Sequence, residues 1–160
     1  MGHLMKPRLF LFLFIAALLL VLGTLAAACG DDGDDGDDED GFVSVVLDDD
    51  VNTGSIIDEE TGAAAFTANA GEITFEVHNE GIILHNLVII RTDLAADSLP
   101  SLVGLVDEEA AGEKIGEIEE FLPDVVEVAS FTLKPGRYVL ICNLRGHYDS
   151  GMFAGLTVEE

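Results

Sequence analysis

Basic side chains are scarce in this sequence: its 160 residues include seven Lys and Arg against 31 Asp and Glu, and the formal net charge is −24. Nucleic-acid binding relies on Lys and Arg side chains that neutralise phosphates, so the composition excludes a nucleic-acid partner. The acidity has two explanations, a solvated surface adapted to high salt or electrostatic attraction towards a basic protein. The length predicts one domain with appendages.

Cysteine is also rare, because the chain contains only Cys29 and Cys142. A disulfide between them would attach the folded part of the chain to its own N-terminal segment, with no evident gain. If Cys29 is modified instead, Cys142 has no partner, and an unpaired thiol in an oxidising compartment calls for an explanation. A bond between Cys142 and a metal ion supplies one.

Residues 1–28 have the organisation of an export signal, with Lys6 and Arg8 ahead of the apolar run Leu9–Ala28. Small residues directly before Cys29 resemble the bacterial lipoprotein motif, in which the cysteine is acylated and becomes the new N-terminus. The alternative is an uncleaved anchor, since Leu9–Ala28 is long enough to span a bilayer. Both interpretations place the rest of the chain outside the cytoplasm, on the periplasmic or cell-surface side of the membrane.

The segment that follows, DDGDDGDDED at Asp31–Asp40, has no apolar side chain to bury. Charge repulsion keeps such a segment extended and disordered. We therefore interpret residues 29–40 as an acylated Cys29 with an acidic tether, and residues 41–160 as the folded domain.

Short strand-like runs dominate the folded domain. Apolar and polar residues alternate over Glu72–Asn79, whereas Leu84–Ile90 is almost continuously apolar. Further runs are found at Phe42–Leu47, which we expect to end at Asp48–Asp50, and at Ile56–Ile57, Ala64–Thr67, Val125–Leu133, Arg137–Cys142 and Phe153–Val158. Several short strands with turn signals between them predict an all-β, antiparallel sandwich.

Residues 91–123 do not fit the strand pattern. Apolar side chains recur there at helical spacing behind Ser98, as a possible N-cap, while glycines at 104, 112 and 116 argue against a long helix. The apolar residues are Leu99, Leu102, Val103, Leu105 and Val106. We predict one or two short helical turns in an excursion between the sheets.

Three side chains that bind soft metals follow one another at equal spacing: Cys142, His147 and Met152. A thiolate, imidazole and a weak thioether form the ligand set of mononuclear copper electron-transfer sites. Gly146 and Gly151 directly precede two of these residues and allow a tight loop, whose ends are fixed by strand-like runs. Together they predict a copper site.

Such a site needs a second imidazole, and His85, at the entrance of the apolar run, is the candidate. His78 lies on the polar face of its strand and is the weaker choice. With His3 in the leader, too few histidines remain for a catalytic copper centre, which argues against an enzyme such as a multicopper oxidase or a nitrite reductase. Structural zinc is disfavoured because Met is a poor zinc ligand.

At these residues the sequence resembles the cupredoxins, or type 1 blue copper proteins, and its ligand spacing is similar to that of rusticyanin-like members. The resemblance covers roughly residues 71–158. It implies a cupredoxin-like Greek-key β-sandwich and one type 1 copper ion bound by His85, Cys142, His147 and an axial Met152. It also implies that Asn86, directly after the first ligand, ties the two ligand loops together.

One position departs from the family pattern, because the family usually has Pro where this chain has Arg145. We expect Asn86 and the backbone amides after Cys142 to donate hydrogen bonds to the sulfur. Water should be excluded by Leu84, Leu144 and Phe153.

The leader and the cupredoxin resemblance together imply a membrane-tethered, extracytoplasmic protein that transfers single electrons between redox partners, and the number of histidines argues that it is not an enzyme. The partner would be a redox protein, such as a basic cytochrome or an oxidase. The alternative is a copper carrier or chaperone that delivers copper to an extracytoplasmic oxidase. Carriers tend to use open sites rich in Met or His, and of the three Met in this chain Met1 and Met5 lie in the leader, which favours electron transfer.

Overall fold

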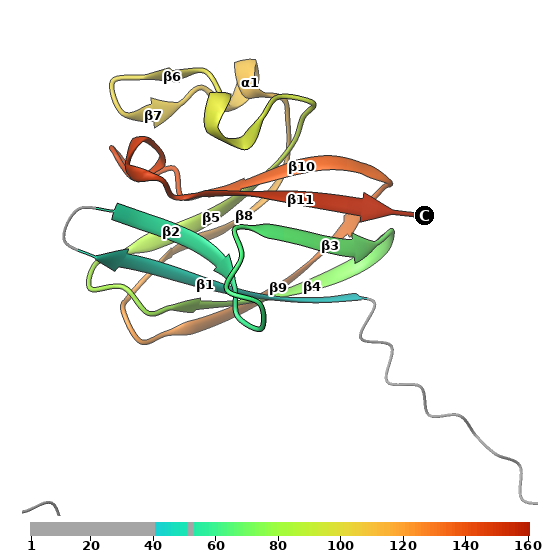
Figure 1. Ribbon diagram of the computed structural model, residues 1–160, viewed down its shortest axis with the longest axis horizontal. Helices are drawn as coiled ribbons and strands as arrows, with labels where there is room; N and C mark the ends of the chain where they lie inside the picture. Colours follow the sequence, from blue (N-terminus) through green and yellow to red (C-terminus); the bar gives the residue numbers. More distant parts are fainter. Residues whose placement is uncertain (1–40, 51–52) are drawn as a thin grey trace, which may run out of the picture. The chain divides into compact units, whose positions relative to one another are not determined.

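The computed structural model describes residues 41–50 and 53–160 (Figure 1). The predicted signal peptide (residues 1–28) and the acylated tether (residues 29–40) lie outside these ranges. In the part of the chain that the structure describes, no helix is long and apolar enough to cross a membrane.

Two β-sheets build the domain, one of four strands in the order β2-β1-β4-β9 and one of five in the order β3-β11-β10-β5-β8. The four-stranded sheet contains β1 (Phe42–Asp50), β2 (Thr53–Asp58), β4 (Gly71–Asn79) and β9 (Val126–Leu133). The five-stranded sheet contains β3 (Ala65–Asn69), β5 (His85–Arg91), β8 (Glu113–Phe121), β10 (Gly136–Ile141) and β11 (Phe153–Glu159).

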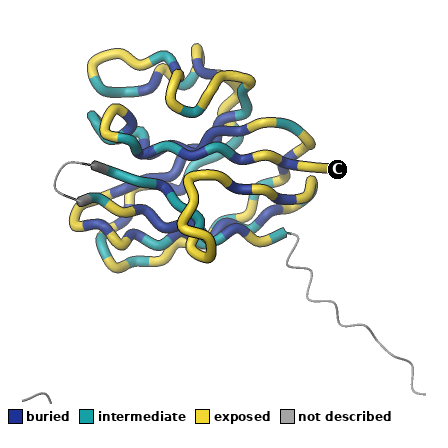
Figure 2. The backbone as a smooth tube through the Cα atoms, in the orientation of Figure 1, coloured by how far each residue is buried: buried dark blue, intermediate teal, exposed yellow. Residues whose placement is uncertain are grey.

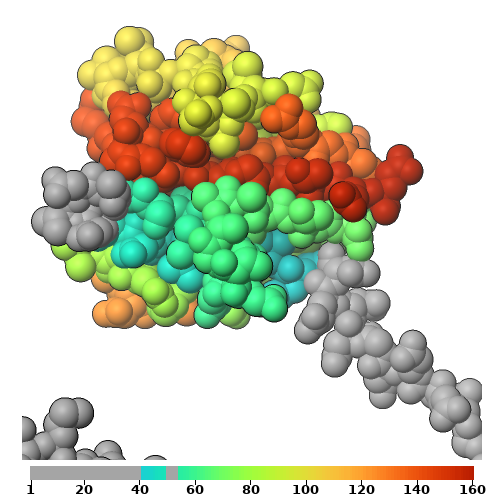
Figure 3. Space-filling model, viewed as in Figure 1, coloured from blue at the N-terminus to red at the C-terminus, as the bar shows by residue number. Residues whose placement is uncertain are grey.

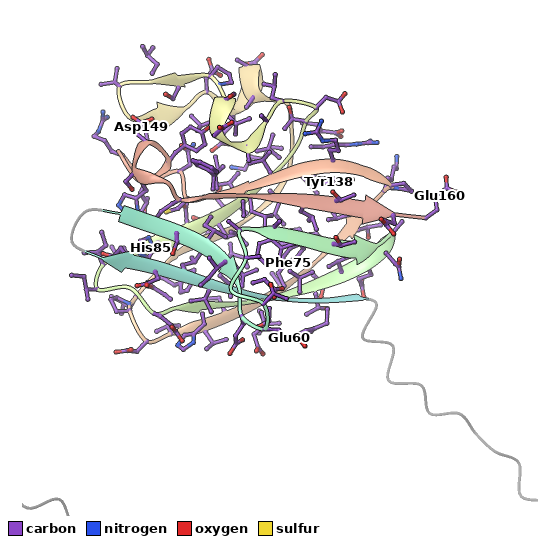
Figure 4. All side chains as sticks on the ribbon, viewed as in Figure 1. Glu60, Phe75, His85, Tyr138, Asp149 and Glu160 are labelled. Atoms are coloured by element: carbon purple, nitrogen blue, oxygen red, sulfur yellow. The ribbon has the colours of Figure 1, made fainter. Side chains whose placement is uncertain are left out.

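Side chains from both sheets meet in one apolar core. The alternation predicted for β4 is confirmed, because Ile73, Phe75 and Val77 are fully buried while Glu72 is exposed. Figure 4 shows Phe75 within the domain, and Figure 2 shows buried and exposed positions along the strands. Burial of an apolar side chain of this size stabilises a fold by about 1.5–3 kcal/mol, so the core is the main source of stability.

A second apolar cluster covers the outer face of the five-stranded sheet. It is built by the connection between β5 and β8, which contains the 3-10 turn η2 (Ala96–Ser98), the hairpin of β6 (Ser101–Leu102) and β7 (Leu105–Val106), and helix α1 (Glu108–Ala111). Leu99 and Val106 of this connection join Val88 and Ile90 of β5 in the cluster. Figure 3 shows the connection, in yellow, against the red C-terminal segment. Because β5 is buried on both faces, its central residues Leu87–Ile90 are all apolar.

Two predictions about the strands are wrong. The sandwich is not wholly antiparallel, since β1 pairs with β4, and β3 with β11, in parallel. The first strand does not end at Leu47. It continues through Asp48–Asp50, because these residues pair with Thr53–Ser55 of β2.

The short helical turns predicted within residues 91–123 are present, as η2 and α1, but they do not lie where the helical spacing of apolar residues placed them. The apolar residues around 99–106 form the β6–β7 hairpin instead of helical turns, and its tip leaves Leu102 and Val103 75% and 72% exposed. A short helix is present, but it begins later, at Glu108, behind an Asp107 side chain that accepts a hydrogen bond from the Ala110 amide. The segment Glu113–Phe121, predicted as part of the excursion, is strand β8 paired with β5.

Both ends of the described domain lie at the same end of the sandwich (Figure 1). Strand β1 starts at Phe42 and reaches Asp49 beside His85, whereas β11 starts directly after Met152 and runs back to Glu159. In Figure 4, Glu160 lies at the opposite end of the domain from His85. The candidate ligands therefore occupy the end of the sandwich remote from both ends of the described domain.

Candidate metal centre

Three ligand atoms of the residues singled out in the sequence converge at one end of the sandwich. His85 is the first residue of β5, Cys142 directly follows β10, and His147 lies in the loop before β11. The Cys142 Sγ lies 3.6 Å from His85 Nδ1 and 3.3 Å from His147 Nδ1, and the two Nδ1 atoms are 3.2 Å apart. All three ligand atoms lie within 4.8 Å of one another, as binding of one ion requires.

The loop from Cys142 to Met152 closes on itself through backbone hydrogen bonds. The Met152 amide donates to the His147 carbonyl, and the Cys142 amide donates to the Met152 carbonyl, both at 3.1 Å. Gly146 and Gly151 have φ angles of 87° and 113°, in the region that L side chains rarely adopt. The two glycines therefore allow the tight path that brings three candidate ligands together.

Met152 is 1% exposed and belongs to the same apolar cluster as Cys142. A Cβ at Gly54 of β2 would lie 2.2 Å from Met152 Cγ and 2.9 Å from its Sδ. Strand β2 thus passes directly over the thioether, and only glycine leaves room for it. The four-stranded sheet closes the site from that side.

The other histidine candidate lies elsewhere. His78 is on the solvent side of β4, where its side chain is 32% exposed and its Nδ1 lies 3.3 Å from a Glu80 carboxylate oxygen. His85, in contrast, is fully buried at the convergence point.

The surroundings of Cys142 disfavour its ionised form when no cation is bound. Burial raises the pKa of this thiol, and the carboxylates of Glu120 and Asp49 raise it further, while hydrogen bonds from the backbone amides of Asn86 and Leu144 act in the opposite direction. A thiolate here needs a positive charge beside it, and a bound metal ion supplies such a charge and deprotonates the thiol.

The imidazole of His147 is held in its neutral form. Burial lowers the pKa of this side chain, and the neighbouring His85 lowers it further, although the Asp49 carboxylate acts against them. A neutral imidazole has a free lone pair, which is the state that binds a metal. Two imidazoles and a buried thiol at these distances form a coordination site in which no donor has to move far.

Asn86 connects the two ligand segments. Its Oδ1 accepts a hydrogen bond from the Asn143 amide at 2.9 Å, and its Nδ2 donates to the Glu117 carboxylate at 2.9 Å. Lys114 joins Glu117 to Glu108 at 2.6 and 2.9 Å, and Glu108 accepts from the Asn143 side chain at 2.8 Å. These five residues form a closed ring, in which the Asn143 backbone amide makes one of the links. Residues 91–123, which did not fit the strand pattern, thus supply three of the five residues that hold the ligand segments in register: Glu108 of α1 and Lys114 and Glu117 of β8.

Part of the predicted environment is wrong. The Asn86 side chain does not donate to the sulfur, because it is engaged with Asn143 and Glu117, and the backbone amide of Asn86 donates instead. Leu84 is 40% exposed. Phe153 packs on Tyr148 on the other face of the sheet, with ring centroids 5.3 Å apart. Only Leu144, of the three residues expected to exclude water, packs against the main core.

The ligand loop is also held by the β5–β8 connection. Arg145, at the position where the family usually has Pro, donates to the Val103 carbonyl. Tyr148 donates through its hydroxyl to the Ala96 carbonyl at 2.7 Å and accepts from the Leu99 amide at 2.8 Å. The Arg145 contact ties the ligand loop to the tip of the β6–β7 hairpin.

Asp49, which was predicted only to help end the first strand, is a further residue at the site. Its Oδ1 lies 3.1 Å from His85 Nε2. The two residues are 36 positions apart. No local pattern could have indicated this contact, since the parallel pairing of β1 with β4 brings the end of β1 to the site.

Sequence comparison gives no assignment, since no family model matches the chain and no curated protein matches it significantly. Structural comparison does: many solved structures match, and auracyanin, azurin and rusticyanin, which are cupredoxins, are among them. At the identities involved, below 25%, the likeness establishes the fold. The chain therefore has the cupredoxin fold, and the predicted all-β sandwich with a short helical excursion is confirmed.

Three structures illustrate the likeness. Reduced auracyanin from Roseiflexus castenholzii is 22% identical with a TM-score of 0.53, covering 74% of this chain and 98% of the other. Auracyanin A from Chloroflexus aurantiacus, a "blue" copper protein, is 19% identical with a TM-score of 0.50, covering 74% and 100%. Rusticyanin from Thiobacillus ferrooxidans is 17% identical with a TM-score of 0.52, covering 74% and 78%. The donor set found here, two imidazoles and a thiol beside a buried thioether, fits one type 1 copper ion.

Proposed function

We propose that this protein is a type 1 copper protein that transfers single electrons between extracytoplasmic redox partners. The observation that carries the proposal is the convergence of one thiol and two imidazole nitrogens within 4.8 Å, in a loop that also contains a buried thioether. A copper ion bound there would supply the one-electron exchange between Cu(II) and Cu(I).

The chain contributes a site that is assembled before metal enters. Backbone hydrogen bonds fix His147 and Met152, and the ring through Asn86 fixes the segments that carry His85 and Cys142. Donors held in this way resist rearrangement when the charge of the ion changes. The same closure favours electron transfer over copper delivery, because a site that exchanges metal needs ligands that open easily.

Apolar side chains lie in the loops around this end of the domain. Ile82 is 75% exposed and Leu122 is 64% exposed. Their chain neighbours Ile83 and Phe121 both accept hydrogen bonds from the Asn79 side chain, which brings the two loops together. The β6–β7 hairpin adds two more exposed apolar residues beside the ligand loop. We propose that a basic redox protein, such as a cytochrome or an oxidase, docks here. The net charge of −24 favours its approach.

The location and the anchor are proposals that rest on the sequence. The leader motif supports export and acylation at Cys29, with the domain held on the outer side of the membrane. If Cys29 carries the lipid, Cys29→Ser releases the protein from the membrane fraction. If Leu9–Ala28 stays as a spanning helix, the same variant remains membrane-bound, and the lipoprotein interpretation is wrong.

Copper titration of the purified protein tests the main proposal. We expect one Cu(II) per chain and an intense visible band from charge transfer between the Cys142 sulfur and copper. Cys142→Ser should lose the band while keeping the fold by circular dichroism. A colourless protein that binds zinc as tightly as copper would refute the assignment.

A further inference from the structure

Asp49, the penultimate residue of β1, contacts the buried candidate ligand His85. Its Oδ1 lies 3.1 Å from His85 Nε2, which is the ring nitrogen that does not face the sulfur. The same oxygen accepts a hydrogen bond from the Ile82 amide at 2.7 Å. The imidazole is 0% exposed and the carboxylate 15%, so the contact is largely shielded from water.

The space around this contact is kept open by a glycine. A Cβ at Gly81 would lie 1.8 Å from Asp49 Oδ1 and 2.7 Å from His85 Nε2. The φ angle of Gly81 is not in the positive range that favours glycine. Glycine is therefore required at this position by the close approach of the carboxylate and the imidazole, and not by the backbone conformation.

A carboxylate at Nε2 selects one form of the ring. It accepts the Nε2 proton, which leaves the Nδ1 lone pair free on the side of Cys142. Two donors face Asp49 Oδ1, the His85 ring and the Ile82 amide, and such contacts favour the carboxylate form. Asp49 therefore places a negative charge beside the ligand.

We infer that Asp49 is a positioning residue of the metal centre, which fixes His85 as an Nδ1 ligand and stabilises Cu(II) relative to Cu(I). The inference rests on the proposed function. The negative charge acts through the imidazole, and the more highly charged ion gains more from it. Asp49 therefore lowers the reduction potential of the site below the value it would have with a neutral group in the same place.

The test compares Asp49→Asn, which keeps an acceptor oxygen and removes the charge, with Asp48→Asn. Asp48 is the exposed neighbour in β1, and no hydrogen bond or ion pair is found for its side chain in the structure as described. Partners of metal-bound histidines typically contribute 10–100-fold to metal affinity. We expect Asp49→Asn to lower the Cu(II) affinity about tenfold relative to the Cu(I) affinity, which raises the midpoint potential by about 59 mV for one electron. Asp48→Asn should leave both affinities within twofold of the wild type.

A second measurement needs no copper. Nitrogen-15 NMR of the metal-free protein reports which ring nitrogen of His85 carries the proton. We expect the Nε2–H form in the wild type and a mixture of both forms in Asp49→Ala, with the fold checked by circular dichroism. Equal potentials in Asp49→Asn and Asp48→Asn, or an unchanged His85 tautomer in Asp49→Ala, would overturn the inference. If the protein bound no copper, the proposed function would fail, while the tautomer would still test the role of Asp49.

Discussion

Replacing Asn86 by Ala should destabilise the metal-free protein without removing any candidate ligand. Asn86 is only 5% exposed, and its side chain makes two hydrogen bonds of 2.9 Å. Truncation leaves the Asn143 amide without its acceptor, which costs about 1–3 kcal/mol for a buried group. It also removes the bond to Glu117, a carboxylate 26% exposed that water can partly satisfy, which adds about 1 kcal/mol.

The total loss is therefore about 2–4 kcal/mol, a large share of the stability of an ordinary domain. Urea unfolding of the metal-free protein measures it, and metal must be absent because binding would add its own stabilisation. With a typical urea dependence, the midpoint should fall by about 1–2 M.

Lys114→Met is the matched control. It breaks the same ring on the far side of Glu117 and keeps the bond between Asn86 and the Asn143 amide. The Lys114 side chain is 38% exposed, so solvent screening limits its ion pairs to about 1 kcal/mol together. A loss in Asn86→Ala no larger than that in Lys114→Met would show that the bond across the ligand segments does not hold the site together.

Three further predictions concern the ligands and the ring. His85→Ala should abolish the visible copper band and His78→Ala should leave it unchanged, since only His85 lies at the site; the reverse result would identify the wrong histidine. Met152→Leu should keep copper and colour but raise the reduction potential, because a thioether stabilises Cu(II) more than an alkyl group does; an unchanged potential would mean that Met152 is not a ligand. Burial raises the pKa of Glu117, but hydrogen bonds from Lys114 and Asn86 outweigh it and bring the pKa below its ordinary value of 4.5. The ionised Glu117 carboxylate therefore stabilises the fold above pH 4.5, and this stabilisation is lost as the pH falls through the lower pKa of the folded state. Glu117→Gln should make the stability of the metal-free protein less dependent on pH in this range. Equally steep plots of urea midpoint against pH for the variant and the wild type would contradict this prediction.

Local patterns predicted what depends on local order. Cys142, His147 and Met152 lie in one short loop, so their spacing indicated a common site that the structure assembles. The alternation in β4 predicted its buried face, because a strand between solvent and core must alternate. His85 could be chosen over His78 for the same reason.

Features that depend on distant pairing were not predictable. Strand β8 is an edge strand, and Glu113–Phe121 carries charged side chains at several positions with no regular alternation. Asp49 was interpreted as part of a strand end, since acidic residues are uncommon in strands, yet the pairing with β2 and the contact with His85 accommodate it. The hairpin tip leaves Leu102 and Val103 exposed, so the helical spacing of apolar residues there did not mark a buried face.

The position of the two ends of the described domain has a practical consequence for attaching the protein to a surface. Strand β1 leads from Phe42 to Asp49 at the ligands, and β11 leads from Met152 back to Glu159, so both ends leave the domain on the side away from His147. The nine residues of β1 span about 30 Å and the seven of β11 about 23 Å, which is the depth of protein between each end and the ligands. Immobilisation of residues 41–160 on an electrode through either end of this domain would therefore present the ligand end to solution. Attachment through a cysteine introduced at Leu122, at the ligand end of the domain, would turn the ligands towards the electrode. The two attachments would give two orientations of the protein for voltammetry.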